Sequence, residues 1–354
     1  MIKIGILTLT TYINYGNRLQ LYAIHRMLNT VCKKKKQVDT IILEFDNKKK
    51  IESKTSLLNS QRLKRTIVFK EFSSNCFKEV RIKGNNEYKM QELDKYDYII
   101  IGSDQVFNPA LKYPWPFEFC SFLNPDKIIV LSGSFGRCYS DIEPKLRPFF
   151  KKGLSRIKNL SVREKTAQKI VYKLTGKESK LILDPCLFGN KRSWGTFANR
   201  QKAFYKSDKY IFTYFLNQKR LNPEILSYIN RLAKRENLKI INCNDPKSNY
   251  FCISPHEFVD LIRHATYVIT NSFHGLCFSV IFEKQFLICD INTNLSVQSR
   301  IDDLLDILDL KYRKFQNAKN NIDEKIKYNT SKLILQKHKE ETEQFLKKAL
   351  GLIE

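Results

Sequence analysis

The stretch Tyr267-Val268-Ile269-Thr270-Asn271-Ser272-Phe273-His274-Gly275-Leu276 decides the fold, because a short apolar strand pattern runs into a polar turn and then a helical pattern. In open α/β sheets, ligands bind beyond the carboxyl ends of the strands, where a helix N-terminus offers free N–H groups to an anion. Histidine is the common side chain that can give or take a proton near neutral pH. His274 is therefore a candidate catalytic residue, with a structural role as the alternative.

Strand and helix patterns alternate along most of the chain, with amphipathic stretches such as 18–28 and 164–174 between apolar, β-branched runs. The runs predict strands at 2–9, 40–45, 98–101, 127–131, 159–162, 181–183, 210–216, 238–242 and 267–270. This βαβ rhythm predicts an α/β fold with mostly parallel strands. Two such halves, joined near residue 200, would leave a cleft between them.

The rhythm also suggests where the domains divide. Residues 47–95 are polar and lysine-rich, so we expect basic helices and loops there. A turn-prone passage at 189–208 separates the two halves. We therefore expect an N-terminal α/β domain at 1–195, a C-terminal α/β domain at 205–315 and a C-terminal helical tail at 316–354.

Composition limits the class of protein. A chain of 354 residues with 42% hydrophobic residues is predicted to be globular and of two domains. Its nine cysteines are scattered and form no CxxC pair, which is typical of reduced thiols in a cytoplasmic protein. No apolar run approaches the roughly 20 residues needed to span a bilayer.

The charge is strongly positive, with 62 Lys+Arg against 36 Asp+Glu and a formal net charge of +26. Nucleic acid is not expected as a partner, because no basic helix with interleaved aromatics, RNP-like strand or zinc-finger spacing is present. Two interpretations stay open. The lysines form a solvated surface, or they make a peripheral contact with acidic lipid at the inner face of the cytoplasmic membrane.

Three further turns after predicted strands carry small or polar residues. Asn14, Gly16 and Asn17 follow the first strand, and a glycine between asparagines can turn backbone N–H groups towards a ligand. The segment 102–104 (Gly-Ser-Asp) and the segment 132–136 around Ser134 follow two others. For 14–17 the alternative is an ordinary strand-to-helix turn, and for Asp104 it is a role as helix N-cap. For 132–136 the alternative is close approach of another backbone.

Arg163 ends the strand predicted at 159–162, where its planar guanidinium suits a carboxylate or phosphate. A structural pair with Glu164 or Asp184 is the alternative. No metal is expected: His256, Asp260 and His264 share a helix face, but His256 falls in the first turn and no further ligand cluster is evident. Neither GxGxxG nor a Walker A sequence supports a nucleotide cofactor.

Taken in order, these motifs resemble the polysaccharide pyruvyl transferase family, over most of the chain from Ile4 to about Leu305. The motifs are 14–17, 101–106, 133–136, 162–164, 183–185, 254–258 and 270–276. The resemblance implies a GT-B-like fold, in which two Rossmann-like domains face each other across the active-site cleft. It also implies transfer of a pyruvyl group from phosphoenolpyruvate to two hydroxyls of one sugar as a cyclic ketal, without a redox cofactor. The implied acceptor is a saccharide or lipid-linked saccharide of capsule, exopolysaccharide or cell wall.

The resemblance assigns catalysis to His274 and donor binding to Arg163. Many family members carry an arginine two residues before the histidine, where this chain has Ser272. Either another cation (Arg163, Arg300 or a lysine) holds the donor anion, or the donor differs. We expect further donor contacts at Asn271, Ser272 and Gly275, and acceptor or phosphate contacts at Asn14, Gly16, Asn17, Ser103, Asp104 and Ser134.

Two other functions stay open on the sequence. One is a GT-B-type glycosyltransferase with a nucleotide-sugar donor, since the implied architecture is shared. The other is a scaffold protein of a polysaccharide assembly complex with a degenerate site, for which Ser272 is the main argument.

Overall fold

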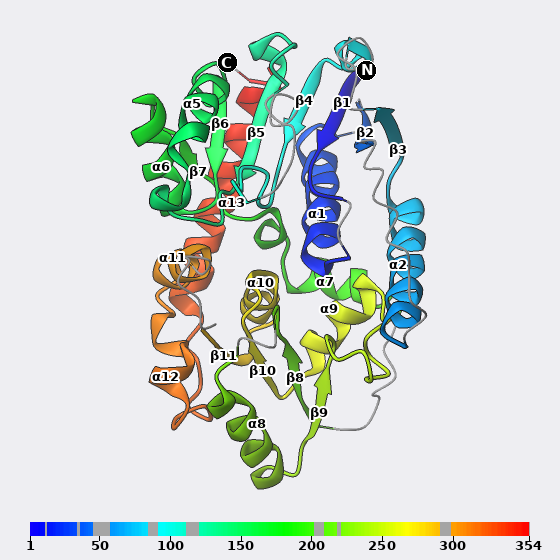
Figure 1. The fold of residues 1–354 in the computed structure, drawn as a ribbon, viewed down its shortest axis with the longest axis vertical. Helices are drawn as coiled ribbons and strands as arrows, with labels where there is room; N and C mark the ends of the chain where they lie inside the picture. Colours follow the sequence, from blue (N-terminus) through cyan, green and yellow to red (C-terminus); the bar gives the residue numbers. More distant parts are fainter. Residues whose placement is uncertain are drawn as a thin grey trace.

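The computed structural model describes residues 1–10, 13–33, 36–44, 57–83, 91–110, 120–201, 209–217, 221–290 and 299–353. Two sheets of parallel strands organise them (Figure 1). The first sheet has the order β3-β2-β1-β4-β5-β6-β7, with β1 Ile2–Leu7, β2 Lys36–Glu44, β3 Glu79–Lys83, β4 Tyr98–Ile101, β5 Ile128–Gly133, β6 Asn159–Val162 and β7 Lys180–Leu181. The second has the order β11-β10-β8-β9, with β8 Tyr210–Tyr214, β9 Lys239–Asn242, β10 Tyr267–Thr270 and β11 Gln285–Ile288.

Helices connect the strands and cover the sheets. They are α1 Tyr15–Val31, α2 Leu57–Cys76, α5 Arg147–Ser155, α6 Lys165–Thr175, α7 Lys191–Ala198, α8 Pro223–Arg235, α9 Pro255–His264, α10 Phe273–Ile281, α11 Ser299–Ile307, α12 Phe315–Ala318 and α13 Asn329–Ala349, with the short 3-10 helix η5 at Pro185–Phe188. The predicted α/β fold with two parallel sheets is confirmed.

Two strands were not predicted. β3 lies inside the stretch 47–95, where only helices and loops were expected, and it pairs with β2 at the edge of the first sheet. Its five residues alternate charged and apolar side chains, which suits an edge strand but is too short to stand out in a lysine-rich region. β11 is a four-residue edge strand of the second sheet. The parts of that stretch at 47–56 and 84–90, and residues 202–208 of the expected turn passage, lie outside the described residues.

The two halves share one hydrophobic core, which contains Ile4 and Ile6 of β1 together with Val268 of β10. Tyr15 at the start of α1 belongs to it. Its ring stacks on Phe258 of α9 with 4.2 Å between centroids, and its hydroxyl donates to the Ile253 carbonyl at 3.0 Å. These contacts fix the first turn of α1 against the second half.

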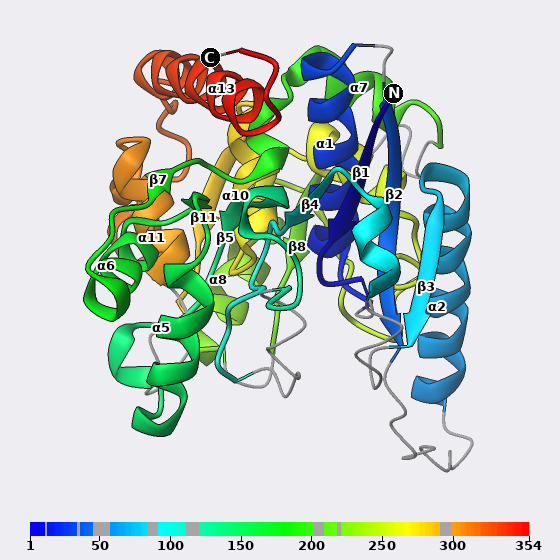
Figure 2. The same ribbon diagram turned by 90° about the horizontal axis from the view of Figure 1, so that it is seen from above.

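The C-terminal helix α13 returns to the first half, where it packs against α1 and η5 (Figure 1). Seen from above, it lies on the opposite side of the molecule from α2 (Figure 2). No helix in the described part of the chain combines the length and the apolar character needed to span a membrane.

Candidate functional site

A cavity of about 360 Å³ lies between the two halves. The first half lines it with Leu9, Ile13, Asn14, Asn17, Asp104, Gln105 and Arg163, and the second half with Leu216, Ser272, Phe273, His274 and Arg300. Sites for small molecules commonly measure about 300–1,000 Å³, so this volume suits a small ligand. The lining mixes apolar side chains with a few buried charges, as binding sites generally do.

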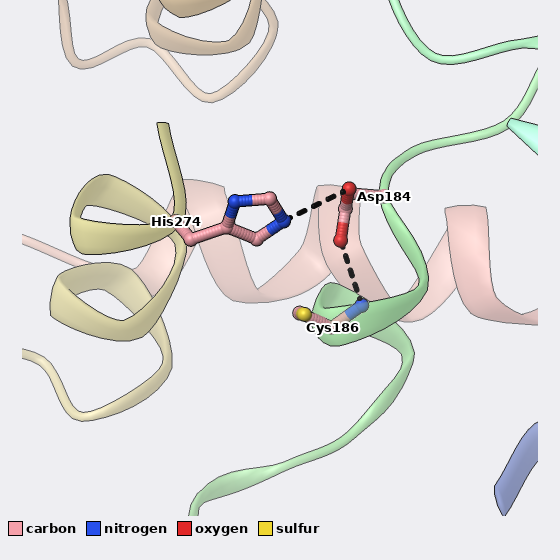
Figure 3. A group of neighbouring side chains, drawn as sticks. All are labelled: Asp184, Cys186 and His274. Atoms are coloured by element: carbon pink, nitrogen blue, oxygen red, sulfur yellow. Dashed lines mark hydrogen bonds and ion pairs between the residues drawn. The ribbon is translucent and has the colours of Figure 1, made fainter. Parts of the chain in front are cut away.

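His274 lies in the first turn of α10 and is 6% exposed. The turn begins at Ser272, whose hydroxyl accepts the Gly275 N–H at 3.3 Å. One ring nitrogen, Nε2, is buried and lies 3.5 Å from Oδ2 of Asp184 (Figure 3). The imidazole is therefore oriented by a carboxylate from the opposite half of the molecule.

Gly16 holds the other side of the imidazole. A Cβ on this residue would overlap Nδ1 and neighbouring ring atoms of His274, so only glycine allows the approach. The Gly16 N–H, which the sequence analysis expected to face a ligand, donates to Oδ1 of Asn14 at 2.8 Å. Gly16 thus supports the catalytic candidate and does not line the cavity itself.

Asp184 is the N-cap of η5, and its side chain is fully buried. Its Oδ1 accepts the Cys186 N–H at 3.0 Å, and its Oδ2 accepts Nη1 of Arg163 at 2.7 Å. Burial alone would raise the pKa of this carboxyl, but His274 and Arg163 together hold it well below its usual range. A permanent negative charge therefore faces the imidazole.

Asp184, Cys186 and His274 also form the group of potential metal ligands found in the described ranges, with their ligand atoms within 4.8 Å of one another (Figure 3). The donor chemistry does not favour a metal here. Burial, and then the charge of Asp184, raise the pKa of the Cys186 thiol well above its usual value, whereas metals bind the thiolate. Arg163 already balances the charge of Asp184. We assign these residues no metal.

Arg163 is surrounded by carboxylates, and none of its side chain is exposed. Nη1 bonds Asp184, Nη2 donates to Oδ1 of Asp104 at 3.0 Å, and Nε lies 3.4 Å from Oε2 of Glu164. This is the structural pairing that the sequence left open as the alternative to anion binding. Its direct contact with a donor stays a prediction, and the geometry favours a positioning role.

Arg300 differs from Arg163 in having no ion pair with a carboxylate in the described part of the chain. It comes from α11, lines the cavity and is 7% exposed, and its Nε and Nη1 are buried without a hydrogen bond to any described residue. Burial, and then the nearby Arg163, lower the pKa of its guanidinium to about 10, so it stays charged at neutral pH. A buried cation with unsatisfied donors is a ready site for an anion.

The first half adds polar groups to the cavity wall. Asn17 donates from Nδ2 to Oδ2 of Asp104, and Asn14 caps α1. Burial raises the pKa of the Asp104 carboxyl, but the positive charges of Arg163, His274 and Arg300 together outweigh that effect and lower the pKa. All three residues, predicted as acceptor or phosphate contacts, thus line the cavity as ordered polar groups.

Four other predicted site residues do not line the cavity and make contacts within the protein. Ser103 donates to the Ser132 carbonyl at 3.0 Å. Asn271 bonds both the N–H and the carbonyl of Leu216, at 2.7 and 2.9 Å, and so fixes a lining residue. Gly275 lies within the first turn of α10. Ser134 donates to Oε1 of Glu164 at 2.7 Å.

The loop around Ser134 shows why sequence could misplace a ligand. Oε1 of Glu164 also accepts the N–H groups of Phe135 and Gly136, at 3.2 and 3.5 Å. The turn does bind an anion, as small residues after a strand suggest, but the anion is a side chain of this chain. The converse omission is Asp184. It lies in the motif 183–185 and was considered as a partner for Arg163, but it was not predicted as a site residue although it follows a predicted strand.

Comparisons with known proteins identify the family and the fold. The profile of the family "Polysaccharide pyruvyl transferase" matches residues 14–293, while no curated protein matches the chain by sequence. Among solved structures, the chain resembles MnaA of S. aureus in a co-structure with UDP, with 12% identity, a TM-score of 0.53 and coverage of 100% of this chain and 98% of that one. It also resembles the UDP-GlcNAc 2-epimerase of Methanocaldococcus jannaschii, with 13% identity, a TM-score of 0.50 and coverage of 96% and 92%.

At these identities the solved structures establish the fold alone, a GT-B-like pair of α/β halves. The family match reaches further. It begins at Asn14, ends beyond His274 and so contains the cavity residues of both halves except Leu9, Ile13 and Arg300. The chain belongs to the polysaccharide pyruvyl transferase family.

Proposed function

We propose that this protein transfers a pyruvyl group from phosphoenolpyruvate to two hydroxyls of one sugar, forming a cyclic ketal. The acceptor is a saccharide or lipid-linked saccharide of a surface polysaccharide. The observation that carries the proposal is the guanidinium of Arg300, which lies in the cavity of His274 and whose buried Nε and Nη1 have no hydrogen-bond partner among the described residues. Phosphoenolpyruvate brings a carboxylate and a phosphate, which are the anions that a guanidinium binds in bidentate fashion.

The reaction requires a group that donates a proton to C3 of phosphoenolpyruvate and groups that accept the protons of the two sugar hydroxyls. Protonation at C3 of the enol phosphate makes C2 cationic, the first sugar hydroxyl adds there, the C2–O bond to phosphate breaks, and the second hydroxyl closes the ketal. One hydroxyl proton replaces the proton given to C3, and the other leaves with phosphate. His274 acts as general acid to the enol or as base to the first hydroxyl, through Nδ1, because Nε2 faces Asp184.

Arg300 is the residue proposed to bind the anionic groups of the donor. It would replace the arginine that many family members carry at the position of Ser272. Arg163 then acts as a positioning residue, since it fixes Asp184 and Asp104 on either side of the site. Asn14, Asn17 and Asp104 are the proposed acceptor contacts, because they line the cavity from the half opposite Arg300.

The test is an assay of the protein with phosphoenolpyruvate and lipid-linked saccharides from the source cells. Turnover is measured as release of phosphate, and NMR detects the ketal. A positioned acid or base contributes about 10²–10⁴ in rate, so His274→Ala should lose that much turnover while still binding phosphoenolpyruvate. His264→Ala, on the accessible end of α9, is the matched control. Normal turnover in His274→Ala would exclude the assigned role.

One alternative enzyme function has an observation in its favour. The S. aureus structure that this fold resembles is a complex with UDP. A nucleotide-sugar donor would bring a base and a diphosphate, so thermal stabilisation by UMP or CMP would favour a glycosyltransferase. The scaffold alternative predicts unchanged glycan pyruvylation in cells that carry His274→Ala.

A further inference from the structure

The outward face of α2 carries two large apolar side chains. Leu63 is 63% exposed and Ile67 is 48% exposed, and they stand one helical turn apart. A surface helix normally turns its apolar side to the core and its polar side to water. α2 already buries Phe69 and Phe72 on its inner side, so the outer pair is additional to the core contact.

Cations surround this pair. Arg62, Lys64 and Lys70 are all exposed on α2, and Glu71 is the acidic residue beside them. An apolar strip flanked by lysine and arginine is typical of a helix that lies in the interface of a membrane with anionic lipid. The proposed active site uses few of the 62 basic residues, so it does not explain this cluster.

The opposite face fixes α2 to the elements around the cavity. The guanidinium carbon of Arg65, which is buried, lies 4.7 Å from the ring centroid of Tyr15 and 4.8 Å from that of Phe251. Tyr15 directly follows Asn14, which lines the cavity. Figures 1 and 2 both show α2 at the edge of the molecule, away from α5 and α13. The outer face is thus presented by a rigidly held helix close to the site.

We propose that the outer face of α2, centred on Leu63 and Ile67, is a docking surface for a lipid bilayer with acidic headgroups. The charges decide between this partner and a second copy of the chain. A symmetric contact would bring Arg62, Lys64 and Lys70 of two copies together, whereas anionic lipid complements them. This inference does not depend on the proposed reaction.

The experiment is co-sedimentation of the full chain with vesicles of phosphatidylcholine alone, and of equal parts phosphatidylcholine and phosphatidylglycerol. We expect binding only to the anionic vesicles, weakened by salt. A basic side chain near such a surface contributes about 1 kcal/mol, so Lys64→Glu should weaken partitioning at least about fivefold. Leu63→Ser with Ile67→Ser should weaken it several-fold as well.

Two variants elsewhere serve as matched controls. Leu333→Ser removes an apolar side chain that is 74% exposed on α13, and Lys152→Glu reverses an exposed charge on α5. Neither should change partitioning, and none of the variants should change the melting temperature, because all these side chains face solvent. Absent vesicle binding, or equal losses in controls and α2 variants, would overturn the proposal. Concentration-dependent dimerisation abolished by the two serine substitutions would overturn it in favour of self-association.

Discussion

At the scale of single residues, the site depends on two buried arginines that differ in their partners. Arg163 meets three carboxylates, and its charge is already balanced. Arg300 has buried N–H donors without a described partner. A buried charge without hydrogen-bond partners costs free energy. An anion bound at Arg300 would offset this cost by accepting hydrogen bonds from its buried N–H groups. We therefore propose separate roles for the two arginines, a structural one for Arg163 and ligand binding for Arg300.

This difference predicts the effect of changing Arg300. Hydrogen bonds to charged groups contribute about 1.5–3 kcal/mol, so Arg300→Ala should weaken phosphoenolpyruvate binding at least about tenfold. Arg300→Lys should fall in between, because it keeps a charge but loses the planar fork. Titration calorimetry measures both, with Arg235→Ala on the surface of α8 as control. Affinity in Arg300→Ala equal to that of the unaltered protein would remove Arg300 from the donor site.

Asp184 is predicted to act on the rate through His274. Asp184→Asn keeps the shape of the side chain but removes the charge that faces Nε2. We expect kcat to fall by about tenfold or more, with the KM for phosphoenolpyruvate little changed and a different pH profile of kcat. Glu164→Gln is the matched variant, since Glu164 is also a partner of Arg163 but forms no hydrogen bond or ion pair with His274 in the described part of the chain. Equal kinetics and equal pH profiles in the two variants would mean that Asp184 is only a structural partner of Arg163.

At the scale of elements, the site forms where the first turns of α1 and α10 meet. α1 starts after β1 of the first sheet and α10 after β10 of the second, so each half contributes a strand-to-helix turn. Asn14 and Ser272 cap the two helices, and Gly16 and His274 are the residues in contact. The geometry of the candidate site is therefore sensitive to the spacing of two helix ends.

Gly16→Ala tests this contact between elements. Alanine usually stabilises a helix by about 1 kcal/mol relative to glycine, so α1 itself should tolerate the change. The new Cβ would displace the imidazole of His274, and turnover should fall by about 10² or more, as for loss of a positioned acid or base. The checks are a kinetic assay beside thermal unfolding. Full turnover in this variant would show that His274 can act from another position.

The same scale shows what sequence patterns could predict. The predicted bounds of the strands at 98–101, 159–162 and 267–270 agree with those in the structure. Runs of apolar residues between polar turns are an unambiguous pattern. The edge strands β3 and β11 were missed, since four or five residues at an edge carry little periodic signal. The helix α7 at 191–198 was likewise read as part of a turn-prone passage.

At the scale of the whole molecule, the two halves are joined by a shared core and by α13. The position of the cavity was predictable, because parallel strands deliver their carboxyl ends to one edge. The pairing of charges inside it was predictable only in part. Glu164 and Asp184 were considered as partners of Arg163, but sequence distance does not tell that Asp104 also reaches Arg163 or that Glu164 fills the Ser134 loop. Arg300 could be named as a candidate cation, but its unmatched state is a property of the folded chain.

Global stability should depend on pH through two histidines. Burial lowers the pKa of His25 to about 4, against the opposing effect of Asp39, and burial with Arg200 lowers that of His256 to about 4. The ordinary value is about 6.5, so between pH 6.5 and pH 4 the unfolded chain binds more protons than the folded one. The free energy of unfolding should therefore be largest above pH 6.5 and fall as the pH drops to about 4.

Urea titrations at a series of pH values measure this loss. Replacing both histidines by glutamine should flatten the profile in that window. Below it, further loss is expected from Asp104 and Asp184, whose pKa values are lowered in the folded state and whose contribution disappears as the pH falls below their ordinary range. A free energy of unfolding that stays constant from pH 6.5 to pH 4 would contradict the assignment of partly buried, neutral imidazoles to His25 and His256.

The most direct test of the proposed donor is thermal unfolding of the full chain with phosphoenolpyruvate, beside phosphate, UMP and CMP. A ligand at 100 times its Kd stabilises the folded state by about 2.7 kcal/mol, which is readily measured. We predict a rise in the melting temperature with phosphoenolpyruvate that exceeds the effect of phosphate and is lost in Arg300→Ala. No response to phosphoenolpyruvate, with a clear response to UMP or CMP, would contradict pyruvyl transfer and assign the cavity to a nucleotide-sugar donor.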